Sequence, residues 1–166
     1  MAIEQRLTPC LWFDDQGEDA AKFYVSIFPN SSIGRISRYG KAGYETHKRP
    51  EGAVMTVMFT LDGVEMMALN GGPIFKFNEA ISLVVNCETQ AEIDRYWNAL
   101  GEGSDPDSHV CGWLKDKFGL SWQIVPVQLG KMMSDPDRAK AGRVMEALLK
   151  MKKLDLAALE RAYKGG

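Results

Sequence analysis

The sequence predicts an α+β fold in which two βαβββ modules are followed by a helical segment. Two observations lead to this prediction. The order strand, helix and three strands occurs twice, at 5–72 and at 79–126, and residues 127–166 show only helical spacing. No residue-level identity joins the two halves, so the repeat is one of element order. A chain of 166 residues is long enough for a single domain in which both modules share a core.

The first module combines one helix with four short strands. Its helix is expected near 17–28, because apolar side chains recur there at helical spacing and Pro29 stops them. Asp62–Gly63 is a strong two-residue hairpin signal between two apolar runs. The strands are expected at Leu7–Phe13, Ser31–Tyr39, Ala53–Leu61 and Val64–Asn70, with a loop at Gly40–Gly52.

The second module repeats this order after a glycine-rich linker that begins at Gly71. Thr89 with Glu92 three residues later has the pattern of a capping box, which marks the start of a helix. The turn-rich loop Gly101–Pro106 ends that helix. The strands are expected at Ile81–Cys87, Asp107–Cys111, Trp113–Lys117 and Ser121–Pro126.

Residues 127–166 carry the signals of amphipathic helices. The stretch from Ser134 to Asp137 supplies a cap, a proline near the first helical position and acidic residues for the first turn. Apolar residues then recur at three and four residues, from Ala141 to Leu149 and again from Leu154 to Tyr163. The apolar faces of these helices must be covered, either by the outer side of the sheet or by another subunit.

Charge and cysteine content exclude several classes of protein. A formal charge of −2 gives no basic surface for nucleic acid, and no apolar run approaches the roughly 18 residues of a membrane span. Three cysteines form no disulfide framework, which is typical of a reducing compartment. Met1–Arg6 carries both charge signs and no apolar region, unlike a signal peptide. We therefore expect a cytoplasmic protein with no nucleic-acid partner and no membrane partner.

Several segments resemble one protein family. They are Thr8–Phe13, Met67–Pro73, the stretch from Gly112 to Pro126 with its two tryptophans, and parts of the tail between Asp135 and Lys153. With the paired modules, they are similar to the PhnB-like branch of the vicinal oxygen chelate superfamily, which includes glyoxalase I, bleomycin-resistance proteins and extradiol dioxygenases. Members of this branch are often described as 3-demethylubiquinone-9 3-methyltransferases. The resemblance implies a curved mixed sheet around a cavity, and a homodimer.

The same resemblance indicates where a metal ion would bind. In the superfamily, metal ligands come from inward positions on the first, fourth, fifth and eighth strands. Those positions correspond to Thr8, Asn70, Ala80 and Gln123, or to Pro9 in place of Thr8 if the first strand shifts by one residue. None of these residues offers the carboxylate or imidazole that Zn²⁺, Ni²⁺ or Fe²⁺ requires. We therefore expect no metal and no other cofactor.

Uncharged and aromatic side chains are the candidates for lining the cavity. Thr8, Cys10 and Trp12 alternate on one side of the first strand. Phe75 and Phe77 flank the crossover between the modules, at the expected rim of a pocket. The polar candidates are Asn70, Asn78, Ser82 and Gln123, and each of them could instead make a structural hydrogen bond.

Other reactive residues have simpler structural explanations. His109 and Cys111 lie two apart on an expected strand, but a metal site would need two more ligands. Cys10 has no base beside it in the sequence that would make it a nucleophile. The one G-x-G pattern, Gly101–Gly103, follows a helix, whereas an S-adenosylmethionine domain of the common type needs it after a strand.

Three functions are consistent with these residues. The first is binding of a small, largely apolar or aromatic metabolite in a metal-free cavity. The second is an enzyme on such a substrate, a methyltransferase by family description or a lyase or isomerase using acid–base chemistry. The third is a protein that sequesters a drug. Turnover of a ligand would separate the second function from the other two, and no catalytic residue is evident from the sequence.

Overall fold

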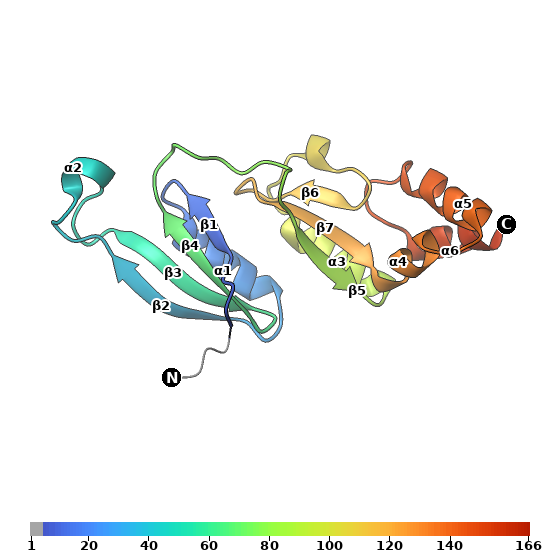
Figure 1. Ribbon diagram of the computed structural model, residues 1–166, viewed down its shortest axis with the longest axis horizontal. Helices are drawn as coiled ribbons and strands as arrows, with labels where there is room; N and C mark the ends of the chain where they lie inside the picture. Colours follow the sequence, from blue (N-terminus) through green and yellow to red (C-terminus); the bar gives the residue numbers. More distant parts are fainter. Residues whose placement is uncertain (1–4) are drawn as a thin grey trace. The chain divides into compact units, whose positions relative to one another are not determined.

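The computed structural model describes residues 5–166 and shows an α+β protein with two sheets (Figure 1). The chain divides into two compact units, Met1–Phe77 and Asn78–Gly166, which we call the first and second units. Each unit has its own sheet and its own covering helix.

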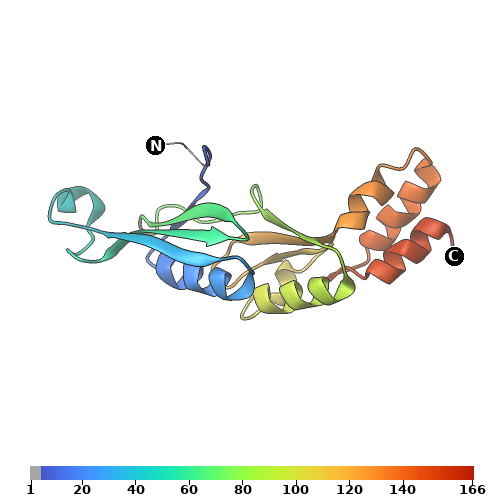
Figure 2. The same ribbon diagram turned by 90° about the horizontal axis from the view of Figure 1, so that it is seen from below.

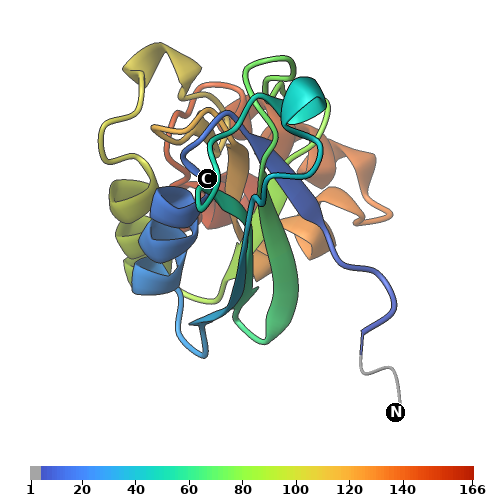
Figure 3. The same ribbon diagram turned by 90° about the vertical axis from the view of Figure 1, so that its left-hand side faces the viewer.

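The first unit has a four-stranded sheet of order β1-β4-β3-β2. Strand β1 pairs in parallel with β4, and the other two pairings are antiparallel. Helix α1 lies against one face of this sheet (Figures 2 and 3). The elements are β1 (Cys10–Phe13), α1 (Gly17–Ile27), β2 (Ser32–Arg38), β3 (Val54–Leu61) and β4 (Val64–Asn70), with a one-turn helix α2 (Tyr44–His47) inside the predicted loop.

The core of the first unit lies between α1 and the sheet. In β1, β3 and β4, every second residue from Leu11, Val57 and Met66 onward is buried on the side of α1, as strand alternation requires. From the helix, Ala20, Ala21 and Tyr24 are completely buried, because they share one face at helical spacing. The strand side of this core consists of Leu11, Phe13, Val57, Phe59, Met66 and Ala68.

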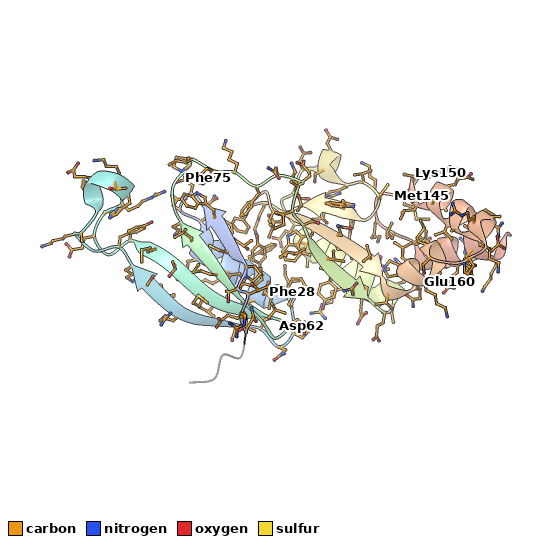
Figure 4. All side chains as sticks on the ribbon, in the orientation of Figure 1. Phe28, Asp62, Phe75, Met145, Lys150 and Glu160 are labelled. Carbon is orange, nitrogen blue, oxygen red and sulfur yellow. The ribbon has the colours of Figure 1, made fainter. Side chains whose placement is uncertain are left out.

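The predicted hairpin at Asp62–Gly63 is confirmed. Leu61 pairs with Val64 across it, and the turn lies at the end of the β3–β4 ribbon (Figure 4). Asp62 has φ 45° and Gly63 has φ 81°, so both central residues adopt the left-handed region that a two-residue I′ turn needs. Aspartate and glycine are among the residues that tolerate this conformation best.

The second unit has a three-stranded sheet of order β5-β7-β6. Strand β5 is parallel to β7, and β6 is antiparallel to β7. Helix α3 packs against one face and contributes the buried residues Ile93, Tyr96 and Leu100. The elements are β5 (Leu83–Cys87), α3 (Gln90–Leu100), the 3₁₀ turn η1 (Pro106–Ser108), β6 (Trp113–Lys115) and β7 (Ser121–Pro126). The predicted capping box is confirmed, since Thr89 and Glu92 bond reciprocally at the start of α3.

The prediction of a strand at Asp107–Cys111 is wrong. The segment contains the 3₁₀ turn η1, and only Val110 forms an isolated bridge, to Trp113. Asp105 accepts a hydrogen bond from the backbone N–H of Asp107, and Pro106 has no N–H to donate. These local features favour a turn. The second unit is therefore βαββ within the described residues, one strand short of the predicted order.

The C-terminal segment forms the helices α4 (Val127–Met133), α5 (Arg138–Leu148) and α6 (Leu156–Lys164). Their apolar faces are covered mainly by one another, which was neither of the two expected arrangements. Met132, Val144, Leu154 and Leu159 form the buried centre of this cluster. Asp137 and Asp155 accept hydrogen bonds from the first turns of α5 and α6 as N-caps. Met145 and Lys150 lie on this segment (Figure 4).

Candidate functional site

The face of the first sheet that α1 does not cover carries only uncharged side chains at its centre. Cys10 pairs with Met67 and Trp12 with Leu69, so these four side chains share a face. Thr56 and Met58 of β3 continue it, paired with Leu69 and Met67. We call these six residues the first open face. Its two methionines and its tryptophan offer polarisable apolar contact area to a ligand.

Trp12 is held firmly on this face. Its indole N–H donates a hydrogen bond to the backbone oxygen of Gly72 at 2.8 Å. Phe75 packs edge-on against it, with ring centroids 4.9 Å apart, and keeps 61% of its own surface exposed. A Cβ atom at Gly71 would overlap the Trp12 ring, so glycine is required there. Trp12 and Phe75, both sequence candidates, therefore form one aromatic platform.

The other aromatic candidate, Phe77, lies elsewhere. Its ring packs edge-on against Phe13 at 5.2 Å between centroids, and Phe13 belongs to the buried core beneath α1. Phe77 is half-buried, which fits a structural role at the end of the first unit. Phe75 therefore contacts Trp12 on the first open face, whereas Phe77 contacts Phe13 in the core, a difference that the linker sequence did not show.

Cys10 and Thr8 are both exposed. Desolvation raises the pKa of the Cys10 thiol above its ordinary value, so the thiolate is disfavoured at neutral pH. Because the thiolate is the nucleophile, Cys10 is poorly suited to covalent catalysis. Thr8 precedes β1, and the carbonyl of the next residue, Pro9, accepts the N–H of Met67.

Asn70 does not lie on the open face, contrary to the expectation from the family pattern. It pairs with Phe13 in the ladder and is 5% exposed, on the side that α1 covers. Its Oδ1 accepts the backbone N–H of Gly17 at 2.8 Å, and its Nδ2 donates to the carbonyl of Val54 at 3.2 Å. Asn70 therefore fastens the first turn of α1 to the sheet.

In the second unit, Gln123 and Ser82 lie on the face that α3 does not cover. The Gln123 amide donates to the Ser82 hydroxyl at 3.0 Å. Gln123 also pairs with Val84 and with Trp113, so these side chains share what we call the second open face. The remaining polar candidate, Asn78, is exposed. It accepts a hydrogen bond from the backbone N–H of Ala80, which is a local turn contact.

A hollow of about 940 Å³ lies beside β6 and is formed entirely by the second unit. We call it the β6 hollow. Trp113, Lys115 and Ser121 line it from the strands, and Val110 lines it from the loop that replaces the predicted strand. None of the sequence candidates is among its lining residues. The sequence reasoning placed Gln123 on an inward face, but it could not show that Trp113 would pair with Gln123 and Lys115 with Ser121.

The polar and charged groups of the β6 hollow differ in the number of partners that each has within the protein. Lys115 forms an ion pair with Glu79, and this pairing lowers the pKa of the Glu79 carboxyl. The buried carboxylate of Asp116 accepts hydrogen bonds from the Trp122 indole and from two backbone N–H groups, so it is structural. The Ser121 hydroxyl is buried and has no hydrogen-bond partner within residues 5–166.

The residues at the family's metal positions do not fit a metal ion. Both side-chain atoms of Asn70 are engaged on the α1 side, and Gln123 bonds to Ser82. Ala80 has no donor atom in its side chain. Among residues 5–166, no three His, Cys, Asp or Glu side chains gather as a metal site would need.

His109 and Cys111 do not form a pair on a strand. The Nε2 atom of His109 lies 2.8 Å from the Ser104 hydroxyl, and its ring packs edge-on against Trp97. Desolvation and the charge of Lys152 lower the pKa of His109 below its usual value. Cys111 has φ 51° and occupies the turn before β6. Both residues therefore serve the structure of this loop.

Comparisons with known proteins agree with this architecture. The model of the family 3-demethylubiquinone-9 3-methyltransferase matches residues 5–125, which leaves α4, α5 and α6 outside the match. A solved PhnB protein from Bacillus cereus, which carries the same family description, is 37% identical, with a TM-score of 0.62. The similarity covers 74% of this chain and 100% of that one. No match is found among curated proteins.

Two more distant structures share the fold. Protein PA1353 from Pseudomonas aeruginosa is 19% identical over 74% of this chain and 98% of that one, with a TM-score of 0.55. The fosfomycin resistance protein FosX from Mesorhizobium loti is 14% identical over 81% of this chain and 100% of that one, with a TM-score of 0.54.

Within residues 5–166, no helix has both the length and the apolar character needed to cross a membrane. The family match spans well over half of the chain and takes in both covering helices and nearly all of both sheets. The chain therefore belongs to the 3-demethylubiquinone-9 3-methyltransferase family, in agreement with its predicted resemblance to PhnB-like proteins, and it shares the fold of the fosfomycin resistance protein FosX.

Proposed function

We propose that this protein binds a small, largely apolar or aromatic metabolite without the help of a metal ion. The observation that carries the proposal is the β6 hollow, whose volume of about 940 Å³ is that of a small-molecule site. Trp113 and Val110 give it apolar walls, and a few polar groups stand between them. That combination orients a ligand while most of the contact remains hydrophobic.

The first open face supports the same proposal independently. The Trp12–Phe75 platform and the neighbouring Met67 and Leu69 suit a flat, weakly polar molecule. Phe75 is largely exposed apart from its contact with Trp12, so a ligand would have ring surface to cover. Trp12, Cys10 and Phe75 thus remain candidates for ligand contact, along with Ser82 and Gln123 on the second open face.

The family description names methyl transfer, but the residues of this chain give that activity little support. Gly101 and Gly103 follow α3, and neither sheet is the doubly wound parallel sheet that binds S-adenosylmethionine in the common type of domain. A general base near neutral pH is usually His, Glu or Asp inside the pocket. The β6 hollow has carboxylates, but Glu79 is paired with Lys115, Asp116 accepts three N–H hydrogen bonds, and Asp105 caps the turn η1. Binding alone, including sequestration of a drug, therefore explains the site with fewer assumptions than turnover does.

Native mass spectrometry of the purified protein tests the proposal directly. We expect a co-purifying molecule of a few hundred daltons, or an added flat aromatic compound, to give a one-to-one complex. Replacing Trp113 by alanine should weaken that complex, whereas replacing the exposed Leu149 of the helical segment should not change it. Chemical turnover of the bound molecule would favour the enzymatic alternative, and a protein that binds no such molecule would contradict the proposal.

We also propose a cytoplasmic homodimer. Ile81 and Val84 expose 67% and 50% of their surfaces, and a second copy could cover such apolar groups. Sedimentation at micromolar concentration should give twice the chain mass of 18.5 kDa. A mass of one chain would refute the dimer without touching the binding proposal.

A further inference from the structure

The Ser121 hydroxyl in the β6 hollow is one of two buried side-chain groups, with the Gln128 amide oxygen, that lack a hydrogen-bond partner among the described residues. Ser121 itself is 1% exposed. Burial of an unpaired hydroxyl is unfavourable, so such a group calls for an explanation. Ser121 lines the hollow, and a ligand is the partner that the chain itself does not supply.

Lys115 is the direct neighbour of this hydroxyl. Ser121 and Lys115 are partners in the β6–β7 ladder, so their side chains stand next to each other on one face. The Lys115 ammonium is bound by the carboxylate of Glu79, which also lines the hollow. Both side chains are partly exposed to solvent, at 35% and 64%, and an exposed ion pair of this kind exchanges readily.

The charge of the lining selects the kind of ligand. Three carboxylates, from Glu79, Asp105 and Asp107, line it beside two ammonium groups, from Lys115 and Lys117, and the Asp116 carboxylate is already bonded within the protein. This excess of negative charge disfavours an anion and favours a cation. Trp113 provides an aromatic surface in the same hollow, and indole is the strongest partner for a cation among the aromatic side chains.

We propose that the β6 hollow binds a small aromatic amine, whose ammonium group replaces that of Lys115 at Glu79 and reaches the Ser121 hydroxyl. In the ligand-free protein, the Lys115 ammonium occupies the place beside Glu79 that the ligand's ammonium takes in the complex. When the ligand binds, the Lys115 side chain moves toward solvent. Ser121 accepts a hydrogen bond from the ligand's N–H, and Trp113 and Val110 contact its ring. This inference rests on the proposed function and names the chemical class of the ligand.

The test uses three probes that share a ring and differ in charge: benzylammonium, benzyl alcohol and benzoate. Binding to the full-length protein is followed by NMR, through the indole N–H signal of Trp113, identified by its loss in Trp113→Phe. Benzylammonium should bind at least several-fold more tightly than benzyl alcohol, and benzoate least tightly. Equal binding of benzylammonium and benzyl alcohol would overturn the inference and leave the proposed function standing. Binding of none of the three would overturn the proposed function at this hollow.

Two lysine variants separate competition from general electrostatics. Lys115→Met and Lys117→Met remove the same charge from the same hollow, but only Lys115 is paired with Glu79. Lys115→Met should tighten benzylammonium binding several-fold more than Lys117→Met does. Equal effects of the two variants would contradict displacement of Lys115.

The acceptor groups are tested by Glu79→Gln and Ser121→Ala, which should each weaken benzylammonium binding several-fold. The control Glu102→Gln removes an exposed carboxylate that does not line the hollow and should have little effect. Ser121→Ala should leave the melting temperature unchanged or higher, because no partner in the described chain loses a bond. A lower melting temperature together with unchanged binding would show that the hydroxyl is structural.

Discussion

Asn70 illustrates how a single polar side chain joins two elements of the first unit. Its amide satisfies one of the free N–H groups at the start of α1 and one carbonyl of β3. Gly17 is part of the same fit, since a Cβ atom there would come within 2.7 Å of the Asn70 oxygen. A residue at a family ligand position has here become part of the core.

Replacing Asn70 by alanine should lower the free energy of unfolding by about 2 kcal/mol. The change removes the partner of one buried backbone N–H, at a cost of about 1–3 kcal/mol before relaxation, and of one partly buried carbonyl, at a smaller cost. Urea unfolding measures the loss. Asn86→Ala on the exposed side of β5 is the control and should stay within about 0.5 kcal/mol of the parent protein. Equal stabilities of the two variants would contradict the structural role of Asn70.

Cys87 gives a prediction about pH. Burial, assisted by the charge of Glu92, raises the pKa of its thiol from 9.0 to about 11. The unfolded chain therefore loses this proton first as the pH rises. The stability that Cys87 contributes is fully present below pH 9.0 and is lost as the pH approaches about 11.

Urea unfolding at about pH 8 and about pH 10 should show a smaller alkaline loss of stability in Cys87→Ala than in the parent protein. The difference between the two pH values is the readout, because deleting a buried side chain lowers stability at every pH. Cys111→Ala controls for the removal of a thiol at a half-buried turn position. The same alkaline loss in Cys87→Ala and in the parent protein would rule out this contribution.

At the scale of elements, the end of β4 shows how backbone and side chain cooperate. The chain leaves β4 through Gly71 and Gly72, and the Trp12 ring lies directly against the Gly71 backbone. The carbonyl of Gly72 then receives the indole N–H. The end of the strand and the aromatic platform therefore depend on each other. The platform can form because two glycines follow the strand.

Gly71→Ala should displace the Trp12 ring and destabilise the protein by about 1–3 kcal/mol, the usual cost of overpacking. The indole N–H signal of Trp12 in NMR spectra and urea unfolding measure the two effects. Gly40→Ala is the matched control, because a Cβ atom at Gly40 meets nothing within 4 Å. An unshifted Trp12 signal in Gly71→Ala would argue against the close approach of ring and backbone.

At the scale of the whole chain, the helical segment is tied to the second sheet by more than its own cluster. Leu154 is completely buried and packs against Gly112, at the turn before β6. The backbone N–H groups of Cys111 and Gly112 bond to the carbonyls of Met151 and Lys152. Gln90 of α3 bonds to the carbonyl of Leu154 and accepts the N–H of Leu156. Residues 127–166 therefore support the walls of the β6 hollow, although they lie outside the family match.

Leu154→Ala should lower the free energy of unfolding by about 2–5 kcal/mol, the range for deleting a fully buried leucine side chain. It should also loosen the Val110–Trp113 turn, which hydrogen exchange at Cys111 and Gly112 would report. Leu149→Ala, at a position that is 64% exposed, serves as the control and should change stability by no more than about 0.5 kcal/mol. Unchanged exchange in Leu154→Ala would uncouple the helical segment from the hollow.

The sequence by itself determined the features that depend on neighbouring residues. Asp62–Gly63 specified a turn, because few other residue pairs adopt φ > 0 twice in succession. Thr89 and Glu92 specified the start of α3 through contacts across one helical turn. The alternation of β7 put Trp122 in the core and Gln123 on the other face.

Only the tertiary structure decided which distant residues meet. The pairing of Asn70 with Phe13, and the placement of Lys115 beside Ser121, depend on strand register, and a shift of one residue reverses every side chain. The expected strand at Asp107–Cys111 also meets distant residues, because the backbone N–H groups of Cys111 and Gly112 bond to the carbonyls of Met151 and Lys152 instead of to a neighbouring strand. The β6 hollow lies where that strand was expected, so its residues could not be read from local pattern alone.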